Sequence, residues 1–262
     1  MIPESAITEW RNTAPWDSPE QIEQDLIMCR ALIELFNDSF LASHLAFRGG
    51  TALHKLYLNP QPRYSEDIDL VQIKSEPIKG TIKQISKVLS FLGNPVIKQK
   101  ANNNTLVFRF ESEIAPIVPI RLKVEINCRE HFNVMGLTTK ELTIQNQWYS
   151  GRCNTTIFTL EELLGTKLRA LYQRRKGRDL YDLYKALTME DVNAENVLLC
   201  YHKYMSFVVD KVPTQKEYLK NIEQKLLDDE FLGDTKLLLR QEEQYDPEKA
   251  YKLIKTRLLN RL

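Results

Sequence analysis

A glycine pair followed by two closely spaced aspartates constrains this chain more than any other stretch of its sequence. Gly49 and Gly50 stand directly before a run with helical apolar spacing, and residues 67–71 alternate as a strand does. Because residues i and i+2 of a strand share a face, Asp67 and Asp69 are expected to point the same way, while their neighbours face the core. The order of glycine turn, helix and acidic strand therefore predicts two carboxylates beside a helix N-terminus.

This combination has the chemistry of a site for a nucleoside triphosphate and its metal ion. Two carboxylates on one face are hard oxygen ligands, which Mg²⁺ accepts together with substrate phosphates. The glycines let the backbone approach a phosphate closely, and the N–H groups of the following helix attract anions. Thr51 and Ser65 add hydroxyls beside the expected site. Thr51 is expected to bind a phosphate oxygen or to cap the helix, and the two roles are compatible.

A third acid is expected on a later strand. Between residues 120 and 126 apolar and polar side chains alternate, which puts Glu125 on the polar face of the segment. There it could support a metal ion or accept a proton from an attacking hydroxyl. The alternative is a solvent-facing Glu125 paired with a lysine across the strand. Glu111 and Glu113 are weaker candidates for the third acid.

A cationic segment follows further along the chain. It contains Lys167, Arg169, Arg174, Arg175, Lys176 and Arg178. A block of this kind is usually a solvated face, and Arg178 could pair with Asp182 one helical turn later. Asp179 stands where a helix is expected to begin, a position at which the helix dipole favours an acid. Asp182 would share a face with Asp179 and could act only to stabilise the helix.

The order of the predicted elements divides the chain near residue 159. A helix is expected at 22–36, and strand-like segments at 45–47, 67–74, 96–97, 105–108, 120–126 and 155–158. From residue 160 on, apolar residues recur at three- and four-residue spacing, which predicts helices. We therefore predict two domains. Residues 1–159 form an α+β domain with an N-terminal helix and a partly antiparallel sheet, and residues 160–262 form a helical bundle.

Composition narrows the class of protein. The net charge is +1 and hydrophobic residues make up 43% of the chain, so any nucleic-acid contact must be a local basic patch on an ordinary globular protein. The four cysteines are scattered without a Cys-x-x-Cys pair, which argues against a zinc site or a disulfide framework. No run of 18 apolar residues and no secretory signal pattern occurs. We expect a cytoplasmic protein without a membrane segment.

Together these motifs resemble the AbiEii/AbiGii-type toxin family of nucleotidyltransferases, within the polymerase-β-like superfamily. The resemblance rests on residues 47–55, on residues 65–70, and on a lysine in a Leu-rich helix followed by Arg-Asp-x-x-Asp-Leu at 178–183. It implies a polymerase-β-like α+β lobe with a mixed sheet, followed by a helical C-terminal lobe. It also implies transfer of a nucleoside monophosphate from an NTP to an acceptor, with Mg²⁺ or Mn²⁺ as cofactor and release of pyrophosphate.

The resemblance assigns roles to individual residues. The implied metal ligands are Asp67, Asp69 and Glu125. The implied nucleotide-binding residues are Gly49, Gly50, Thr51, Ser65 and Lys167. The implied catalytic residues are Asp67, Asp69, Lys167, Asp179 and Glu125. Lys167 would neutralise the triphosphate as a point charge, and Asp179 would orient the lysine or act as a base.

The resemblance further implies partners and a biological setting. Related toxins modify tRNA acceptor ends or bind GTP, and they act with a cognate antitoxin to block bacterial growth or phage propagation. Two other functions remain open: a catalytically silent regulator that binds GTP or another NTP, and an interaction protein that works through its helical lobe. The presence of both aspartates, the glycine turn and Lys167 favours the enzyme.

Overall fold

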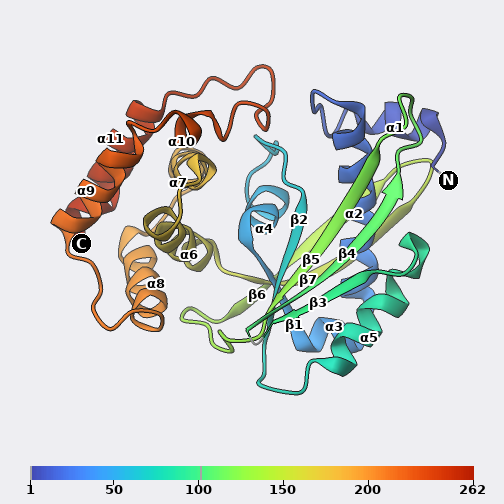
Figure 1. Ribbon diagram of the computed structural model, residues 1–262, viewed down its shortest axis with the longest axis horizontal. Coiled ribbons are helices and arrows are strands. Elements are labelled where there is room, and N and C mark those ends of the chain that lie inside the picture. The colour runs from blue at the N-terminus through green and yellow to red at the C-terminus, as the bar shows by residue number, and fades with distance from the viewer. Residues whose placement is uncertain (1, 101) are drawn as a thin grey trace. The chain divides into compact units, whose positions relative to one another are not determined.

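The computed structural model describes residues 2–100 and 102–262, which form two compact units. The first unit comprises the chain up to Asn133 together with Leu137–Phe158, and the second comprises Val134–Gly136 together with Thr159–Leu262. Figure 1 labels the helices and strands of both units. Among the described residues, all strands belong to the first unit.

A seven-stranded mixed sheet forms the centre of the first unit. Its strands are β1 (Leu45–Arg48), β2 (Asp67–Gln72), β3 (Val96–Lys100), β4 (Asn103–Glu111), β5 (Pro119–Asn127), β6 (Leu137–Gln145) and β7 (Ser150–Phe158). They lie in the order β3-β4-β5-β2-β1-β7-β6, with β1 parallel to β7, β2 parallel to β5, and the other neighbours antiparallel. The predicted α+β class with a mixed sheet is confirmed.

The helices of the first unit lie on both faces of this sheet. They are α1 (Glu4–Trp10), α2 (Pro19–Asn37), α3 (Ser39–His44), α4 (Gly49–Leu56), α5 (Lys79–Val88) and the 3-10 turn η1 (Ser90–Leu92). In Figure 1, α2, α3 and α5 lie along one face and α4 lies on the other. Phe36 of α2 contacts Phe47 of β1, and the strand partner of Phe47, Leu70, is also buried. The face toward α2 is therefore apolar, and the intervening polar residues of β2 point to the face that carries α4.

Strand β6 and the first half of β7 are absent from the sequence-based prediction. Only Leu142 and Ile144 of β6 are buried, and the rest of the strand is polar or partly exposed. Strand β6 lies at one edge of the sheet, where its single neighbour is β7. An edge strand with so few inward positions lacks the apolar alternation by which strands are recognised.

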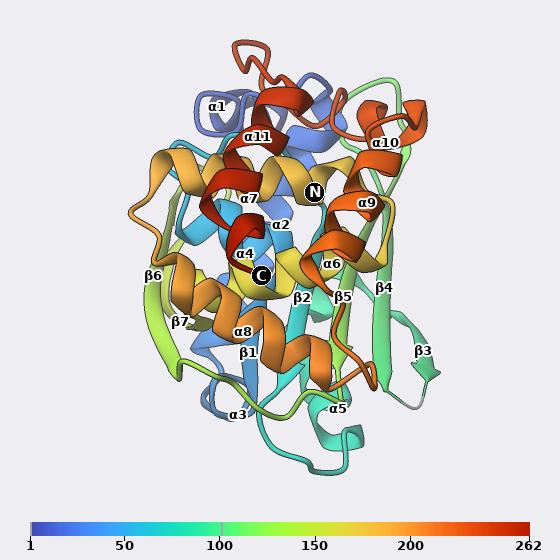
Figure 2. The ribbon, with the colours of Figure 1, turned by 90° about the vertical axis from the view of Figure 1, so that its left-hand side faces the viewer.

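Most helices of the second unit begin at a residue whose side chain caps the first turn. They are α6 (Leu160–Gln173), α7 (Gly177–Met189), α8 (Ala194–Ser206), α9 (Gln215–Lys225), α10 (Asp229–Gly233), α11 (Pro247–Arg257) and the 3-10 turn η2 (Leu259–Arg261), all labelled in Figure 1 or Figure 2 except η2. The side chains of Thr159 and Asn193 accept N–H groups of the first turns of α6 and α8. Thr214 and Glu217 form a reciprocal capping box at the start of α9.

Helix α6 is held tightly within the second unit. A Cβ added at Gly165 would lie 2.5 Å from Cβ of Cys200, so α6 and α8 pack at a distance that only glycine permits there. The fully buried carboxylate of Glu162 accepts the Tyr204 hydroxyl at 2.6 Å. It also accepts the backbone N–H groups of Val134 at 2.8 Å and Met135 at 3.0 Å, which attaches this short segment to the second unit.

Within the described part of the chain, no helix combines the length and the apolar character that crossing a lipid bilayer requires.

Candidate active site

Three acidic side chains lie on the α4 face of the sheet. Asp67 and Asp69 share a face of β2, opposite the buried Ile68 and Leu70. Asp69 stands directly across the parallel pair from Glu125 of β5. Directly paired residues of adjacent strands point to the same face, so Glu125 belongs to the same surface as the two aspartates. The predicted third acid therefore lies beside the predicted pair.

The N-terminus of α4 lies directly against Asp69. Gly49 has a φ of +82°, a left-handed conformation that disfavours other residues. A Cβ at this position would also overlap the carboxylate of Asp69. The glycine turn thus serves two purposes, since it starts the helix in an unusual backbone conformation and leaves room for an acidic side chain.

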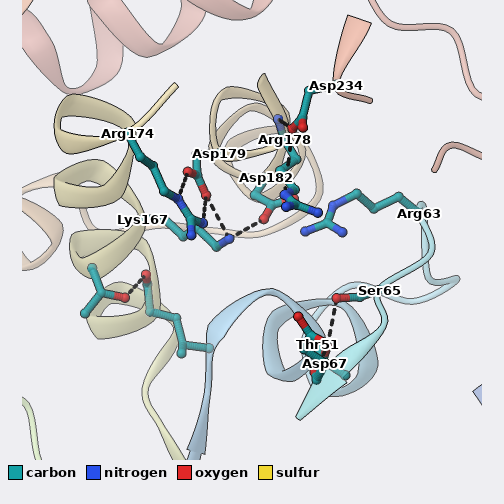
Figure 3. A network of polar contacts seen from close by, with 12 residues as sticks. Thr51, Arg63, Ser65, Asp67, Lys167, Arg174, Arg178, Asp179, Asp182 and Asp234 are labelled. Atoms are coloured by element: carbon teal, nitrogen blue, oxygen red, sulfur yellow. Dashed lines mark hydrogen bonds and ion pairs between the residues drawn. The ribbon is translucent and has the colours of Figure 1, made fainter. Parts of the chain in front are cut away.

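The hydroxyl of Thr51 does not cap α4. Arg48 occupies the N-cap position and Thr51 lies inside the helix, so the capping alternative is wrong. The buried Thr51 hydroxyl donates to the backbone carbonyl of Asp67 at 2.5 Å and lies 2.7 Å from Oγ of Ser65 (Figure 3). This bridge fixes α4 to the beginning of β2. Ser65, which is less buried than Thr51, is the more accessible of the two hydroxyls.

A lysine that sequence reasoning did not single out completes this surface. Nζ of Lys123 lies 2.9 Å from Asp67 and 3.3 Å from Glu125. Lys123 is two residues before Glu125 on β5 and directly across from Asp67, which places all three side chains on one face. Glu125 is thus paired with a lysine, but one of its own strand and not one across the strand, and it also lies beside Asp69.

Burial and these contacts shift the pKa values of Asp67 and Lys123. Burial raises the pKa of Asp67, and the hydrogen bond and positive charge of Lys123 offset only part of that effect. Burial alone would lower the pKa of Lys123, but Asp67 and Glu125 together raise it. The ammonium is therefore firmly charged, and the carboxylates already share one cation.

The donor set fits a divalent metal ion that arrives with a nucleotide. Among residues 2–100 and 102–262, no group of three His, Cys, Asp or Glu side chains is placed to hold a metal by itself. Two aspartates on one face, with Glu125 beside them, are nevertheless the oxygen ligands that Mg²⁺ uses when substrate phosphates supply the remaining positions. In the structure, Lys123 offsets part of the charge of Asp67 and Glu125.

The second unit contains a separate buried charge cluster. Nζ of Lys167 on α6 lies 3.0 Å from Asp179 and 2.7 Å from Asp182, both on α7 (Figure 3). Arg174 donates two hydrogen bonds to Asp179, at 2.6 and 2.8 Å. Both aspartates are fully buried and Lys167 nearly so. Asp182 therefore does more than stabilise its own helix, because it holds the ammonium of Lys167.

Opposing effects set the ionisation of Asp179. Burial would raise the pKa of this carboxyl, but the positive charges of Lys167 and Arg174 outweigh burial and hold the pKa below its ordinary value. The carboxylate is therefore charged at neutral pH. An ionised acid with two cationic partners fixes the position of both cations.

The other cations of the 167–178 segment are also engaged. Arg175 pairs with Asp228, and Lys176 and Arg178 pair with Asp234. Arg169 lies over the ring of Tyr204. Arg174 and Arg175 are more than half exposed, as in a solvated face, and most of these side chains also form ion pairs within the second unit. Both acidic partners flank α10, and no sequence rule assigns them to these cations.

A mixed sheet with two aspartates and a third acid beside a glycine-led helix is the arrangement expected of a nucleotidyltransferase. The family model described as "Nucleotidyl transferase AbiEii toxin, Type IV TA system" matches residues 30–255. The chain belongs to this family of nucleotidyltransferase toxins, and the resemblance found in its sequence is confirmed. A comparison with curated proteins gives no match.

Solved structures support the fold assignment. MenT4, a nucleotidyltransferase toxin from Mycobacterium tuberculosis, superposes with a TM-score of 0.64 at 15% identity, over 100% of this chain and 91% of that one. JHP933 from Helicobacter pylori superposes with a TM-score of 0.56 at 21% identity, over 92% of this chain and 90% of that one. At these identities the likeness concerns the fold.

Proposed function

We propose that this protein transfers a nucleoside monophosphate from an NTP to an acceptor hydroxyl and releases pyrophosphate, as the toxin of a toxin–antitoxin pair. The observation that carries the proposal is the meeting of Asp67, Asp69 and Glu125 on the surface against which α4 begins. Phosphoryl-type transfers depend mainly on positioning and on charge stabilisation, and this surface offers both.

The first unit supplies the residues for the nucleotide. The N–H groups at Gly49 and Gly50 would bind the terminal phosphates at the positive end of α4, with Ser65 adding a hydroxyl and Thr51 holding the helix in place. Asp67, Asp69 and Glu125 would hold Mg²⁺ or Mn²⁺, which when bound would offset negative charge on the reacting phosphate and on the leaving oxygen. Lys123 would keep the unliganded carboxylates from repelling one another.

We assign Lys167 to neutralisation of the triphosphate. A lysine ammonium has three N–H donors, and Asp179 and Asp182 use two of them. The motif that Lys167 shares with the family supports this assignment, and the two aspartates fix the direction of the ammonium. In this assignment Asp179 orients Lys167, and its low pKa makes it a poor acceptor for the proton of the attacking hydroxyl.

We propose RNA, and tRNA in particular, as the acceptor, because toxins that this chain resembles modify tRNA acceptor ends. Exposed cations such as Arg174 and Arg175 could meet RNA phosphates without losing their acidic partners. Since NTPs and tRNA are cytoplasmic, we place the reaction in the cytoplasm. A cognate antitoxin would restrain it, in a setting of growth control or phage defence.

The test is pyrophosphate release by the purified protein with each NTP, Mg²⁺ or Mn²⁺, and total bacterial RNA. We expect release with at least one NTP, dependent on RNA, and loss of at least about a hundredfold in the Asp67→Asn/Asp69→Asn variant, as expected when charge-stabilising groups are removed. Nucleotide binding without pyrophosphate release under any of these conditions would instead favour the silent regulator.

A further inference from the structure

Strand β3 forms an open edge of the sheet. It has β4 as its neighbour on one side and no described strand on the other, and Figure 2 shows it at the outer edge of the sheet. Alternate residues of an antiparallel strand direct their backbone N–H and C=O groups away from the neighbouring strand. Within residues 2–100 and 102–262, no hydrogen bond joins these outward groups of β3 to another part of the chain. The edge can therefore pair with another strand.

This edge also exposes apolar side chains. Every residue of β3 is exposed, and Val96 and Ile97 are 51% and 45% exposed. Consecutive residues of a strand point to opposite faces, so each face of β3 carries one of them. Strand β6 at the other edge of the sheet differs, because its Leu142 and Ile144 are buried and its exposed residues are all polar. An added strand would therefore bury more apolar surface at β3 than at β6.

Lysines occupy one face of β3. Lys98 pairs with Thr105 of β4, which pairs with Glu125 of β5, so Lys98 lies on the sheet face that carries α4. Lys100 is two residues further on and shares this face. Opposite charges directly across a strand pair stabilise it, so an added strand would place acidic residues beside these lysines. Its alternate residues would lie beside Ile97 on the other face and would be apolar.

The helix that precedes β3 in the chain adds to the positive charge. Lys79, Lys83 and Lys87 follow one another at four-residue spacing along α5, and all three are exposed. In the described part of the chain, neither these lysines nor those of β3 form an ion pair. Glu76, the one acid between residues 70 and 110, lies against His44. A positive field of this kind steers an acidic partner toward its site.

These features select one kind of occupant. A second copy of β3, paired antiparallel in full overlap, would place Lys98 of the two copies opposite each other, which like-charge repulsion opposes. A nucleic acid offers phosphate oxygens to the lysines, but it has no row of alternating N–H and C=O groups to match a strand edge. An extended acidic peptide supplies both the charges and the backbone groups.

We propose that β3 binds an extended acidic segment of a partner protein, which adds to the seven-stranded sheet as a further strand. The segment alternates acidic residues, which face Lys98 and Lys100, with apolar residues, which cover Ile97. Backbone hydrogen bonds supply affinity, and the lysines select the acidic partner and reject a basic one. None of these residues belongs to the surface to which we assign nucleotidyl transfer, so the inference does not rest on the proposed function.

The first test compares two short synthetic peptides by fluorescence anisotropy. One alternates glutamate with valine, and the other has lysine in place of glutamate. We expect the acidic peptide to bind at least about tenfold more tightly, as two favourable cross-strand pairs replace two unfavourable ones. Lys98→Glu/Lys100→Glu should reverse this preference. Lys216→Glu/Lys220→Glu is the matched control, because it makes the same change at two exposed lysines of α9 in the second unit, and it should keep the preference.

A third peptide separates strand pairing from charge attraction alone. N-methylation of alternate residues of the acidic peptide removes the backbone donors of one side and keeps all of its charges. If the peptide pairs with β3, this change should weaken binding at least about tenfold, because several backbone hydrogen bonds are lost. The unmodified acidic peptide should also slow amide hydrogen exchange in β3.

Each outcome decides one part of the inference. Failure of the acidic peptide to bind more tightly than the basic one would contradict it, as would a preference that Lys98→Glu/Lys100→Glu leaves unchanged. Equal binding of the methylated and unmethylated acidic peptides would show attraction by charge without strand addition. If the protein released pyrophosphate from no NTP, the proposed function would fail, and the result of the peptide experiments would stand.

Discussion

At Gly49 the backbone leaves no room for a side chain. A Gly49→Ala change would strain a backbone at φ +82° and push a methyl group into the Asp69 carboxylate. We expect the free energy of unfolding to fall by about 1–2 kcal/mol, the cost of a left-handed conformation for a residue with Cβ. Because Asp69 must also move, we expect the rate of nucleotidyl transfer to fall at least about tenfold. This corresponds to a rise of about 1.4 kcal/mol in the activation free energy. Urea denaturation and the transfer assay measure the two effects.

Gly80 supplies the control for this change. It lies in α5, and a Cβ there would meet nothing within 4 Å. Gly80→Ala should leave transfer unchanged and raise the free energy of unfolding by up to about 1 kcal/mol, since alanine favours a helix over glycine. Equal transfer by the Gly49 and Gly80 variants would show that close contact with Asp69 is unimportant.

The ionised carboxylate of Asp179 should stabilise the fold in a way that depends on pH. Its folded-state pKa is lower than its ordinary value, so its contribution is complete above about pH 5 and is lost as the pH falls through the folded-state pKa. We expect Asp179→Asn to lower the free energy of unfolding by about 3 kcal/mol at pH 7, as for breaking a buried ion pair. The difference from wild type should shrink below about pH 4.

Urea denaturation of both proteins from pH 7 down to pH 3 tests this expectation. A difference that stays constant across the range would mean that the Asp179→Asn variant loses packing or hydrogen bonds, and not a charge interaction. The sequence indicated Lys167 and Asp179 by their motif. The partners Asp182 and Arg174 became clear only in the structure, because helix pairing decides which side chains meet.

At the scale of elements, a buried ion pair connects α2 with the helix that begins at the glycine turn. Nζ of Lys55 on α4 lies 2.5 Å from Asp25 on α2, and Asp25 also accepts the indole N–H of Trp10 on α1 at 2.9 Å. Both charged side chains are almost completely buried. This contact fixes the orientation of α4, and through α4 the position of its N-terminus beside Asp69.

We expect Lys55→Met to lower the free energy of unfolding by about 3–5 kcal/mol, because it leaves the Asp25 carboxylate buried without its cation. The Asp25→Asn/Lys55→Met double variant should recover a large part of this loss. Urea denaturation of the two single variants and the double variant gives the coupling energy. If the losses of the single variants simply add, the two side chains do not interact as the structure indicates.

The elements themselves were predictable to different degrees. Strand β5 was found because its buried and exposed positions alternate along nearly its whole length. The pairing of Asp69 with Glu125 could not be predicted in the same way, because β2 and β5 pair in parallel with β3 and β4 between them in the chain. The alternation of β5 predicted which face of the sheet carries Glu125. Only the register between β2 and β5 in the structure shows that Asp69 is its neighbour. Lys123 was overlooked for the same reason.

At the scale of the whole molecule, the match to the AbiEii family extends over sequence from both units. Helical periodicity predicted where the second unit takes up the chain, close to Thr159. It could not assign Val134–Gly136 to that unit, because this segment is attached by backbone N–H groups that bind Glu162. Backbone hydrogen bonds of this kind do not depend on the side chains of the segment, so its sequence does not predict them.

The central claim is that the acidic surface of the first unit catalyses nucleotidyl transfer. The most direct measurement compares NTP labelled at the α-phosphate with the same NTP labelled at the γ-phosphate, each incubated with RNA and Mg²⁺. We predict that the RNA acquires the α-label and not the γ-label, and that Asp67→Asn/Asp69→Asn transfers neither. Transfer of the γ-label would make the protein a kinase, and α-label transfer that survives in the double variant would place catalysis elsewhere in the molecule.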